Sequence, residues 1–485
     1  MGESIKRQTI KGVFWSGLEK ISTYLVTFII NVIMARLLTP ADYGVVGIIA
    51  VFVSFSQLFI DGGFTTALIA KSDRDETDYS TVFVFNFVSS IILYILLFLG
   101  APLIEDFYGI LQLGEIIRAY CLTLILSSFS AVQITQLTVR VDFKSISKIN
   151  IPAGVFSGCF GIFLAYLGWG VWAIVGQQLL FSVLRVVLAI YFSKWYPVFS
   201  FSFQRFKRLF AFSSNLVLAS LIDKIYTNSY PLFIGKFFEP ATLGNYTRGV
   251  QFGSLPSNIM GDIFNRVTFP LMSNIQDDNL SLVKLYRKYI KLSSFIIFPI
   301  MMMVVIASEP IVRLLLTEKW LGCVRFMQII SMAFMLAHIG VINRNLLYVK
   351  KHSDWALRLE IFKKVIAILI FLVSTIWGIW GVVIGQWVYD MIAPSLNAYY
   401  TKRLIGLSLW QQIHDYIGLW FISVSSAIIP LWFVSIIDNV IIQLFVPSLC
   451  YIVIYVLLNV IFKTEPLGYA ILGIQQIIVK WKEKK

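Results

Sequence analysis

Charged side chains are scarce in this sequence, because Asp, Glu, Lys and Arg make up only 14% of its 485 residues. A soluble domain typically carries about 25% charged residues, which cover its surface. Hydrophobic residues instead reach 58%, and the mean hydropathy is +0.80. This shortage of charge excludes a soluble globular protein and indicates a chain that lies mostly in a membrane.

Cysteine, histidine and nucleotide-binding motifs are also few or missing. The three histidines are scattered, and the sequence contains no G-x-x-x-x-G-K-[ST] pattern that would bind ATP. The cysteines stand singly, which suggests neither a disulfide framework nor a zinc site. They are Cys121, Cys159, Cys323 and Cys450. We therefore expect a protein that is not an enzyme, with no catalytic residue, no metal site and no cofactor.

One acidic segment of the sequence contains a D-x-D spacing. In "SDRDETD", Asp73 and Asp75 have the spacing that metal-dependent glycosyltransferases use. No catalytic domain surrounds this short segment, so we interpret it as a solvated loop.

Long apolar runs are abundant. A helix needs about 20 apolar residues to cross a membrane, and its backbone must satisfy its own hydrogen bonds there. The runs predict an all-α polytopic membrane protein of about fourteen transmembrane helices. The expected spans are 13–35, 44–69, 82–104, 116–138, 149–167, 172–193, 209–236, 243–270, 290–308, 323–348, 362–378, 381–400, 416–436 and 440–462.

The basic residues give these spans an orientation. Most of the 40 Lys and Arg residues fall at the termini and in alternate loops, whereas few fall in the other loops. Cytoplasmic loops retain positive charge, so both termini are predicted to be cytoplasmic. Topology and contact with anionic membrane lipids also explain the net charge of +14, and no nucleic-acid partner is expected.

Two similar ten-residue segments follow the first span of each half. They are "ARLLTPADYG", ending at Gly44, and "GKFFEPATLG", ending at Gly244. Because six spans separate them, both copies enter the membrane in the same direction. We expect proline to end the preceding helix and glycine to allow a tight re-entry turn. Two parallel six-helix lobes around a central substrate path are a recurrent plan of transporters. The predicted domains are lobes 1–200 and 201–405, followed by two further helices and a basic cytoplasmic tail in 406–485.

Several sequence blocks resemble one known family. They are "IMARLLTPADYGVVGIIAVF", "DGGFTTALIAK", "TVFVFNF", "APLIEDFYG", "LGWGVWAIVGQQL", "LGNYTRGVQFGSLPSN" and "FPLMSNIQDD". Their order and spacing resemble the Wzx-type polysaccharide flippases, in the colanic-acid-exporter-like branch of the MOP superfamily. The resemblance implies a bacterial inner-membrane protein that moves undecaprenyl-pyrophosphate-linked oligosaccharide from the cytoplasmic to the periplasmic leaflet. Lipopolysaccharide or exopolysaccharide biosynthesis is the implied setting, with membrane lipids and glycan assembly enzymes as implied partners.

A pyrophosphate and a sugar chain need a polar, cationic path that is shielded from lipid. Arg185 and Lys224 lie deepest in the predicted spans, and we expect them to face the cavity. Three other candidates lie closer to helix ends, where snorkelling to the interface explains them equally well. The candidates for substrate binding are Lys20, Arg185, Lys224, Arg248, Arg266 and Arg344.

Each acidic or amide side chain inside the expected spans can have one of two roles. An acid can bind a coupling proton or sodium ion, or it can pair with a neighbouring Lys or Arg, which is the usual reason such charges are tolerated. The acids are Glu19, Asp61, Asp223, Asp262 and Asp390. Polar residues can line a sugar path or join helices by hydrogen bonds. These are Asn86, Gln133, Gln136, Gln177, Gln178, Asn215, Asn228, Gln251 and Asn258.

Two rival functions stay open at this point. The first is a MATE-like drug/cation antiporter of the same superfamily, although a cationic interior suits an anionic lipid better than a cationic drug. The second is a membrane polysaccharide polymerase or ligase, which would be expected to carry a long periplasmic loop. The longest periplasmic connections expected here, near 100–115 and 309–322, are short.

Overall fold

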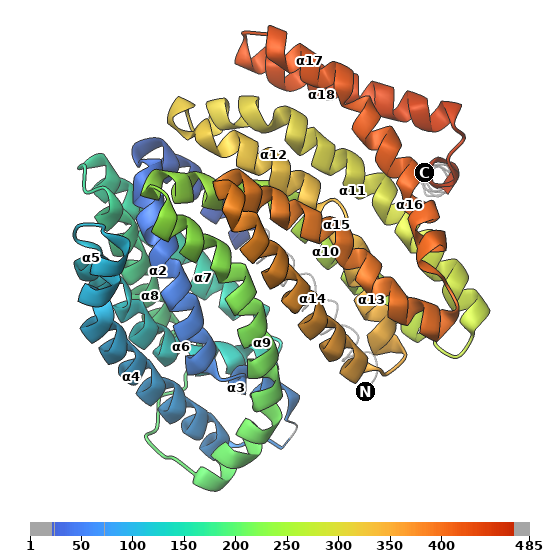
Figure 1. Ribbon diagram of the computed structural model, residues 1–485. Coiled ribbons are helices and arrows are strands. Elements are labelled where there is room, and N and C mark those ends of the chain that lie inside the picture. The colour runs from blue at the N-terminus through green and yellow to red at the C-terminus, as the bar shows by residue number, and fades with distance from the viewer. Residues whose placement is uncertain (1–21, 24, 72, 470–485) are drawn as a thin grey trace, which may run out of the picture. The chain divides into compact units, whose positions relative to one another are not determined.

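The computed structural model describes residues 22–469, apart from 24 and 72. Every regular element in these residues is a helix (Figure 1). The all-α polytopic fold expected from the sequence is therefore confirmed. Two candidate site residues, Glu19 and Lys20, lie outside the described residues.

The described helices account for the expected membrane spans. Ten stretches are long and apolar enough to cross a membrane, and one of them, Asp354–Ile405, contains two helices joined by a tight turn. A shorter apolar helix, Leu25–Leu37, lies in the first expected span. Two further helices, Phe203–Phe237 and Pro240–Ser273, have membrane-spanning length but a more polar composition. Together these helices give the fourteen that the sequence predicts.

By its internal contacts the chain divides into two compact units, Met1–Gly244 and Asn245–Lys485. In the first unit, α6 and α7 both pack against α8, and α2 packs against α9 (Figure 1). Its helices are α2 (Pro40–Asp61), α3 (Phe64–Ala70), α4 (Glu76–Tyr108), α5 (Leu113–Tyr120), α6 (Leu122–Val139), α7 (Phe143–Tyr166), α8 (Val171–Ser193) and α9 (Phe203–Phe237).

In the second unit α11 is the central helix, because it packs against α12, α16 and α18. Its helices are α10 (Pro240–Ser273, which begins in the first unit), α11 (Asn279–Leu315), η1 (Glu318–Trp320), α12 (Gly322–Phe334), α13 (Ala337–Val349), α14 (Ser353–Ser374), η2 (Thr375–Trp377), α15 (Gly378–Ile405), α16 (Leu409–Ser426), α17 (Ile428–Ile436) and α18 (Val440–Ile461). The three-part division at residues 200 and 405, which follows the repeat, stays a prediction.

The repeated Pro-Ala-x-x-Gly segments start helices and touch each other. Pro40 is the first residue of α2, and Pro240 is the first residue of α10. A Cβ atom on Gly44 would overlap the backbone carbonyl of Pro240, and one on Gly244 would overlap the carbonyl of Pro40. The contact is reciprocal, so each glycine lets the other copy's helix start approach closely. The expected role of these glycines in a re-entry turn is wrong, because both lie inside helices.

The acidic segment before α4 forms a helix cap and ion pairs, whereas the sequence suggested only a solvated loop. Asp75 caps α4 in a reciprocal capping box with Asp78, and its carboxylate lies 2.8 Å from Arg205 at the start of α9. Asp78 is fully buried and pairs with Lys71 at 2.5 Å and with Arg205 at 3.2 Å. These contacts connect the starts of α4 and α9.

Polar contacts in the core of the second unit tie α16 to α11. The Tyr286 hydroxyl lies 2.9 Å from Gln412 Oε1 and 2.6 Å from Asn343 Oδ1. The next residue of α11, Arg287, donates two hydrogen bonds to Asp415, from Nε at 2.8 Å and from Nη2 at 2.7 Å. The Asp415 side chain is fully buried, so this bidentate pair provides the partner that a buried carboxylate requires.

Replacing either repeat glycine by alanine is expected to destabilise the protein. Gly44→Ala and Gly244→Ala each overpack the helix contact, at a cost of about 1–3 kcal/mol. Thermal unfolding in detergent measures the effect. Gly100→Ala is the control, since a Cβ there meets nothing within 4 Å and should be neutral or slightly stabilising. Equal unfolding temperatures for all three variants would contradict the close contact.

Removing the cation from the α11–α16 pair should also lower stability. Arg287→Met leaves Asp415 buried with only Lys291, at 3.6 Å, as a cationic neighbour. We expect a loss of about 2 kcal/mol, less than for a fully buried pair, because the Arg287 side chain is 37% exposed. Chemical unfolding with Arg287→Lys as a partial rescue and exposed Lys284→Met as a control tests this. A loss no larger than that of the control would show that the pair contributes nothing.

Candidate functional site

Helix α10 presents a stripe of exposed polar side chains along one face. Gln251, Asn258, Asp262 and Asn265 recur at spacings of three, four or seven residues, which is one side of a helix, and all four are exposed. Next to them, a Cβ on Gly261 would meet nothing within 4 Å, so space is open beside the stripe. The helix has 34 residues and is about 50 Å long, enough to cross the hydrocarbon layer. Gln251 accepts a hydrogen bond from Arg248, and Asn258 donates one to Ser254 at 3.3 Å, so the exposed atoms of the stripe keep hydrogen-bonding capacity for water or a polar ligand.

Helix α9 carries a comparable polar face. Ser220, Asp223 and Thr227 are exposed, and Lys224 lies half-buried beside them. The Thr227 hydroxyl donates to the Asp223 carbonyl at 2.9 Å, and Asn228 donates to the Lys224 carbonyl at 2.8 Å. These hydroxyl and amide groups are thus partly satisfied by their own helix, while the Lys224 ammonium remains near the polar face. Each compact unit therefore contains one long helix with a polar face.

The structure buries Arg248, which sequence reasoning treated as either cavity-facing or snorkelling. Its side chain is 3% exposed, its guanidinium lies 5.7 Å from the centre of the Trp320 ring, and Nη1 donates to Gln251. A cation over an indole ring is favourable, and the geometry also holds Gln251 at the end of the α10 stripe. The role of Arg248 in substrate binding stays a prediction. Arg266 lies on α10, but its side chain is outside the described set.

A second polar group lies between α6 and α8 in the first unit. Leu137 of α6 and Ala189 of α8 share one apolar cluster. Because both helices run in the same direction, Gln133 and Arg185, each four residues earlier, lie at one level of this interface.

Gln133 and Gln136 are fully buried. Within the described chain, their amide atoms and Arg185 Nε have no hydrogen-bond partner. Each unpaired buried group costs about 1–3 kcal/mol, so this site calls for water or a ligand. We name it the α6–α8 polar site.

Arg344 belongs to a charged cluster on α13, α14 and α15. Its Nη1 lies 3.8 Å from Glu360, which also accepts a 2.7 Å bond from Lys363. Lys363 and Lys364 are the charged groups that act on Asp390. For Arg344 the contacts therefore favour structural pairing over substrate binding, whereas the role of Asp390 stays a prediction.

Sequence reasoning missed Glu360 and Lys363, because they fall at the edge of the expected span. Their spacing of three residues on one helix was the available signal.

Two further candidates also have structural partners. Asp61, at the end of α2, accepts a hydrogen bond from Thr65. Asn86 is buried in α4, and its side-chain nitrogen donates to the Ile60 carbonyl at 2.8 Å and to Val82 at 3.3 Å. Asn86 therefore joins α4 to α2, which is the helix-joining role that the sequence left open.

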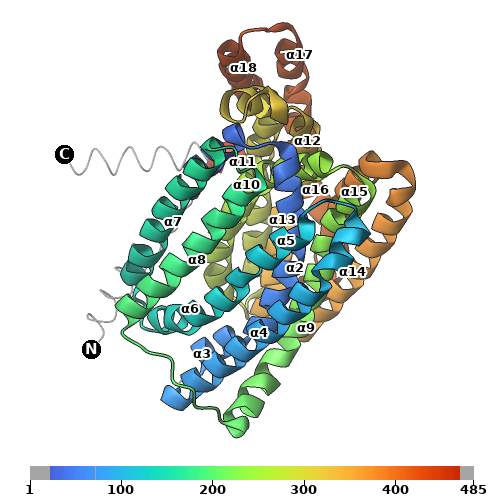
Figure 2. The same ribbon diagram turned by 90° about the vertical axis from the view of Figure 1, so that its left-hand side faces the viewer.

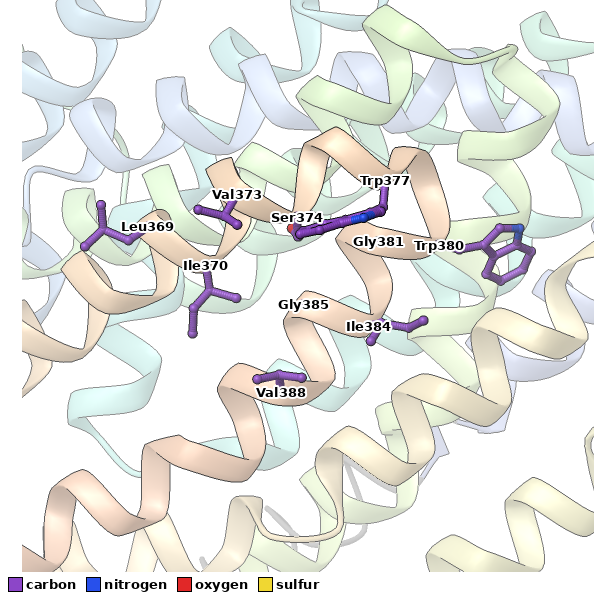
Figure 3. Close-up of a pocket in the computed structure, with 10 residues that line it drawn as sticks. All are labelled: Leu369, Ile370, Val373, Ser374, Trp377, Trp380, Gly381, Ile384, Gly385 and Val388. Atoms are coloured by element: carbon purple, nitrogen blue, oxygen red, sulfur yellow. The ribbon is translucent and has the colours of Figure 1, made fainter.

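An apolar hollow of about 610 Å³ lies on the hairpin formed by α14 and α15 (Figure 3). Trp377 and Trp380 line its outer end, and Gly381 and Gly385 pack closely against Ser374. Its walls offer almost no hydrogen-bonding group, so a sugar or a phosphate has no partner there. Over the described residues, no group of three or more His, Cys, Asp or Glu side chains is placed to hold a metal ion.

Solved structures place this architecture in a class of proteins. The chain is similar to the lipid II flippase MurJ in an inward closed conformation, with a TM-score of 0.74, 14% identity, and coverage of 92% of this chain and 98% of that one. It is also similar to an inward-facing multidrug resistance MATE family transporter of the MOP superfamily, with a TM-score of 0.58, 18% identity, and coverage of 79% and 94%. The fold is that of these multi-pass helical membrane proteins.

The family follows from the sequence. A family model described as "polysaccharide biosynthesis protein" matches residues 33–325. The chain belongs to this polysaccharide biosynthesis protein family, which confirms the resemblance to Wzx-type proteins.

Two curated proteins are similar to this chain over most of its length. One is the teichuronic acid biosynthesis protein TuaB of Bacillus subtilis, 24% identical over 82% of this chain and 86% of its own. Another is the lipopolysaccharide biosynthesis protein WzxC of Escherichia coli K12, 23% identical over 88% of each chain.

The α6–α8 polar site gives a prediction that separates stability from function. Gln133→Met removes two unpaired buried polar atoms without much change in volume, so unfolding stability should stay equal or rise by about 1–3 kcal/mol. Glycan export should nevertheless fall, because the site loses the groups that bind water or cargo. Thermal unfolding and a surface-glycan assay on the same variant measure both effects. Leu137→Met, one turn away, is the matched control. Unchanged export would leave the site a packing feature.

Proposed function

We propose that this protein is a flippase that moves undecaprenyl-pyrophosphate-linked oligosaccharide from the cytoplasmic to the periplasmic leaflet of a bacterial inner membrane. Alternating access of two lobes drives the exchange, with both chain termini on the cytoplasmic side. The observation that carries this proposal is the polar stripe of α10, supported by the polar face of α9. A membrane-spanning helix with exposed amides and a carboxylate is compatible with a sugar-lined path and incompatible with lipid.

The chemistry of these side chains suits a sugar chain. Carboxamides such as Gln251, Asn258 and Asn265 both donate and accept hydrogen bonds, as sugar hydroxyls do. The Lys224 ammonium and the Arg185 guanidinium supply positive charge for a pyrophosphate. We assign Lys224, the α10 stripe and Arg185 to cargo contact, Arg185 as part of the α6–α8 polar site.

The named relatives support this choice over the two rivals. TuaB is a teichuronic acid biosynthesis protein, WzxC is a lipopolysaccharide biosynthesis protein, and MurJ is a lipid II flippase. A drug/cation antiporter shares the fold but would not need cations and several amides along its path. A polymerase or ligase would need catalytic chemistry that none of these relatives' names suggests. Contacts with glycan assembly enzymes stay a prediction from the family resemblance.

Deleting the gene in its native host and restoring it from a plasmid tests the proposal. A flippase predicts that lipid-linked repeat units accumulate on the cytoplasmic side while surface glycan is lost, and that the plasmid reverses both. The trapped intermediate then identifies the sugar. If unpolymerised units instead accumulate in the periplasm, the protein acts after translocation and the proposal is wrong.

Charge-removing variants test the assigned residues. Lys224→Ala and Arg185→Ala should each lower export at least tenfold, the size expected for losing one charge-assisted hydrogen bond to the pyrophosphate. Expression and unfolding temperature should stay close to those of the parent protein. Lys284→Ala, at an exposed lysine of α11, is the matched control. Normal export in both variants would remove the cargo contact from Lys224 and Arg185.

A further inference from the structure

A hollow of about 550 Å³ lies on the second unit, where α16 passes α11 and the end of α18. Its position is at the edge of the membrane spans, because Glu465 follows the span that ends at Ile461 and His414 lies near the start of the span Leu409–Ile436. We name it the α16 groove. None of the residues assigned to cargo lines it, so its function is separate from the flippase path.

One end of the α16 groove is charged and electrically balanced. Lys291 Nζ lies 2.7 Å from Glu465 and 3.6 Å from Asp415, and Asp415 also binds Arg287. Two cations and two carboxylates thus cancel, with His414 at the rim. The Glu465 side chain is 62% exposed and the Lys291 side chain 18% exposed, so a head group reaches Glu465 directly and reaches Lys291 by replacing its contact with Glu465.

The rest of the α16 groove is apolar and elongated. Along α16 it is lined by Ile417, Phe421 and Ile422 and extends to Ser425. From His414 to Ser425 the helix rises about 16 Å, which is half of a typical hydrocarbon core. Gly418 forms part of the lining, and a Cβ there would meet nothing within 4 Å. The groove therefore has a polar head region and an apolar channel the length of one leaflet.

We propose that the α16 groove binds a phospholipid of the bilayer whose head group carries both a phosphate and a primary ammonium. Lys291 binds the phosphate, Glu465 binds the ammonium, and an acyl chain lies along Phe421. The balanced charge favours such a head group over a purely anionic one. A purely anionic head, including the pyrophosphate of a glycan carrier, would face the carboxylates of Asp415 and Glu465 without a compensating charge of its own.

Native mass spectrometry of the full chain in detergent tests this proposal. The probes are phosphatidylethanolamine, phosphatidylglycerol and undecaprenyl phosphate, each added at equal concentration. We expect phosphatidylethanolamine to be retained most strongly by the parent protein and by Gly418→Ala. Gly418→Leu fills the open space and should reduce its retention about tenfold. Gly100→Leu, another glycine in a span with open space around it, is the control and should retain lipid normally.

The head-group assignment has its own variant. Glu465→Gln removes the exposed carboxylate, so the preference should shift from phosphatidylethanolamine towards phosphatidylglycerol. Size-exclusion profiles and circular dichroism show that each variant is folded. Equal retention by Gly418→Leu, an unchanged preference in Glu465→Gln, or a preference for undecaprenyl phosphate in the parent protein would each overturn the proposal. Loss of glycan export with normal lipid retention would concern the flippase path alone.

Discussion

The structure depends on one constraint. Hydrocarbon offers no hydrogen-bond partner, so every polar group at membrane depth needs a partner within the protein or contact with water. The backbone meets this requirement by forming helices throughout the described residues. Most buried charges meet it in pairs, as Asp415 does with Arg287 and Lys363 does with Glu360. The polar stripe of α10 is exposed instead, and we propose that it contacts a polar cargo.

A second constraint is the close approach of the two repeat copies. Gly44 lies against the Pro240 carbonyl and Gly244 against the Pro40 carbonyl, so a side chain at either position would separate the helix starts. The view in Figure 2 shows how the helices that follow Pro40 and precede Pro240, α2 and α9, run beside each other in the first unit. The two copies of the repeated segment therefore make a reciprocal contact.

The sequence predicted the helical membrane architecture well because hydrophobic length is a direct consequence of the membrane. Four of its candidates, Gln251, Asn258, Asp262 and Lys224, lie on or beside the polar faces of α9 and α10, and their roles stay predictions. It did not predict the burial of Arg248 over Trp320, because a cation and a ring 72 residues apart meet only in the tertiary fold. Nor did it find the pairing of Asp75 with Arg205, which joins two helices across the first unit. The sequence singled out the repeat glycines but assigned them to a turn. Glycine is favoured both in tight turns and where two backbones pack closely, so the residue type alone did not separate the two.

The central claim is that the polar stripe of α10 contacts a lipid-linked oligosaccharide as it crosses the membrane. Reconstituting the purified protein into vesicles with a fluorescent lipid-linked oligosaccharide, and measuring the fraction that an external quencher reaches over time, tests it most directly. The account predicts rapid exchange with the parent protein and slow exchange when Asn258 and Asp262 are replaced by leucine in a folded double variant. Unchanged exchange in that variant, or no exchange with the parent protein, would contradict the claim.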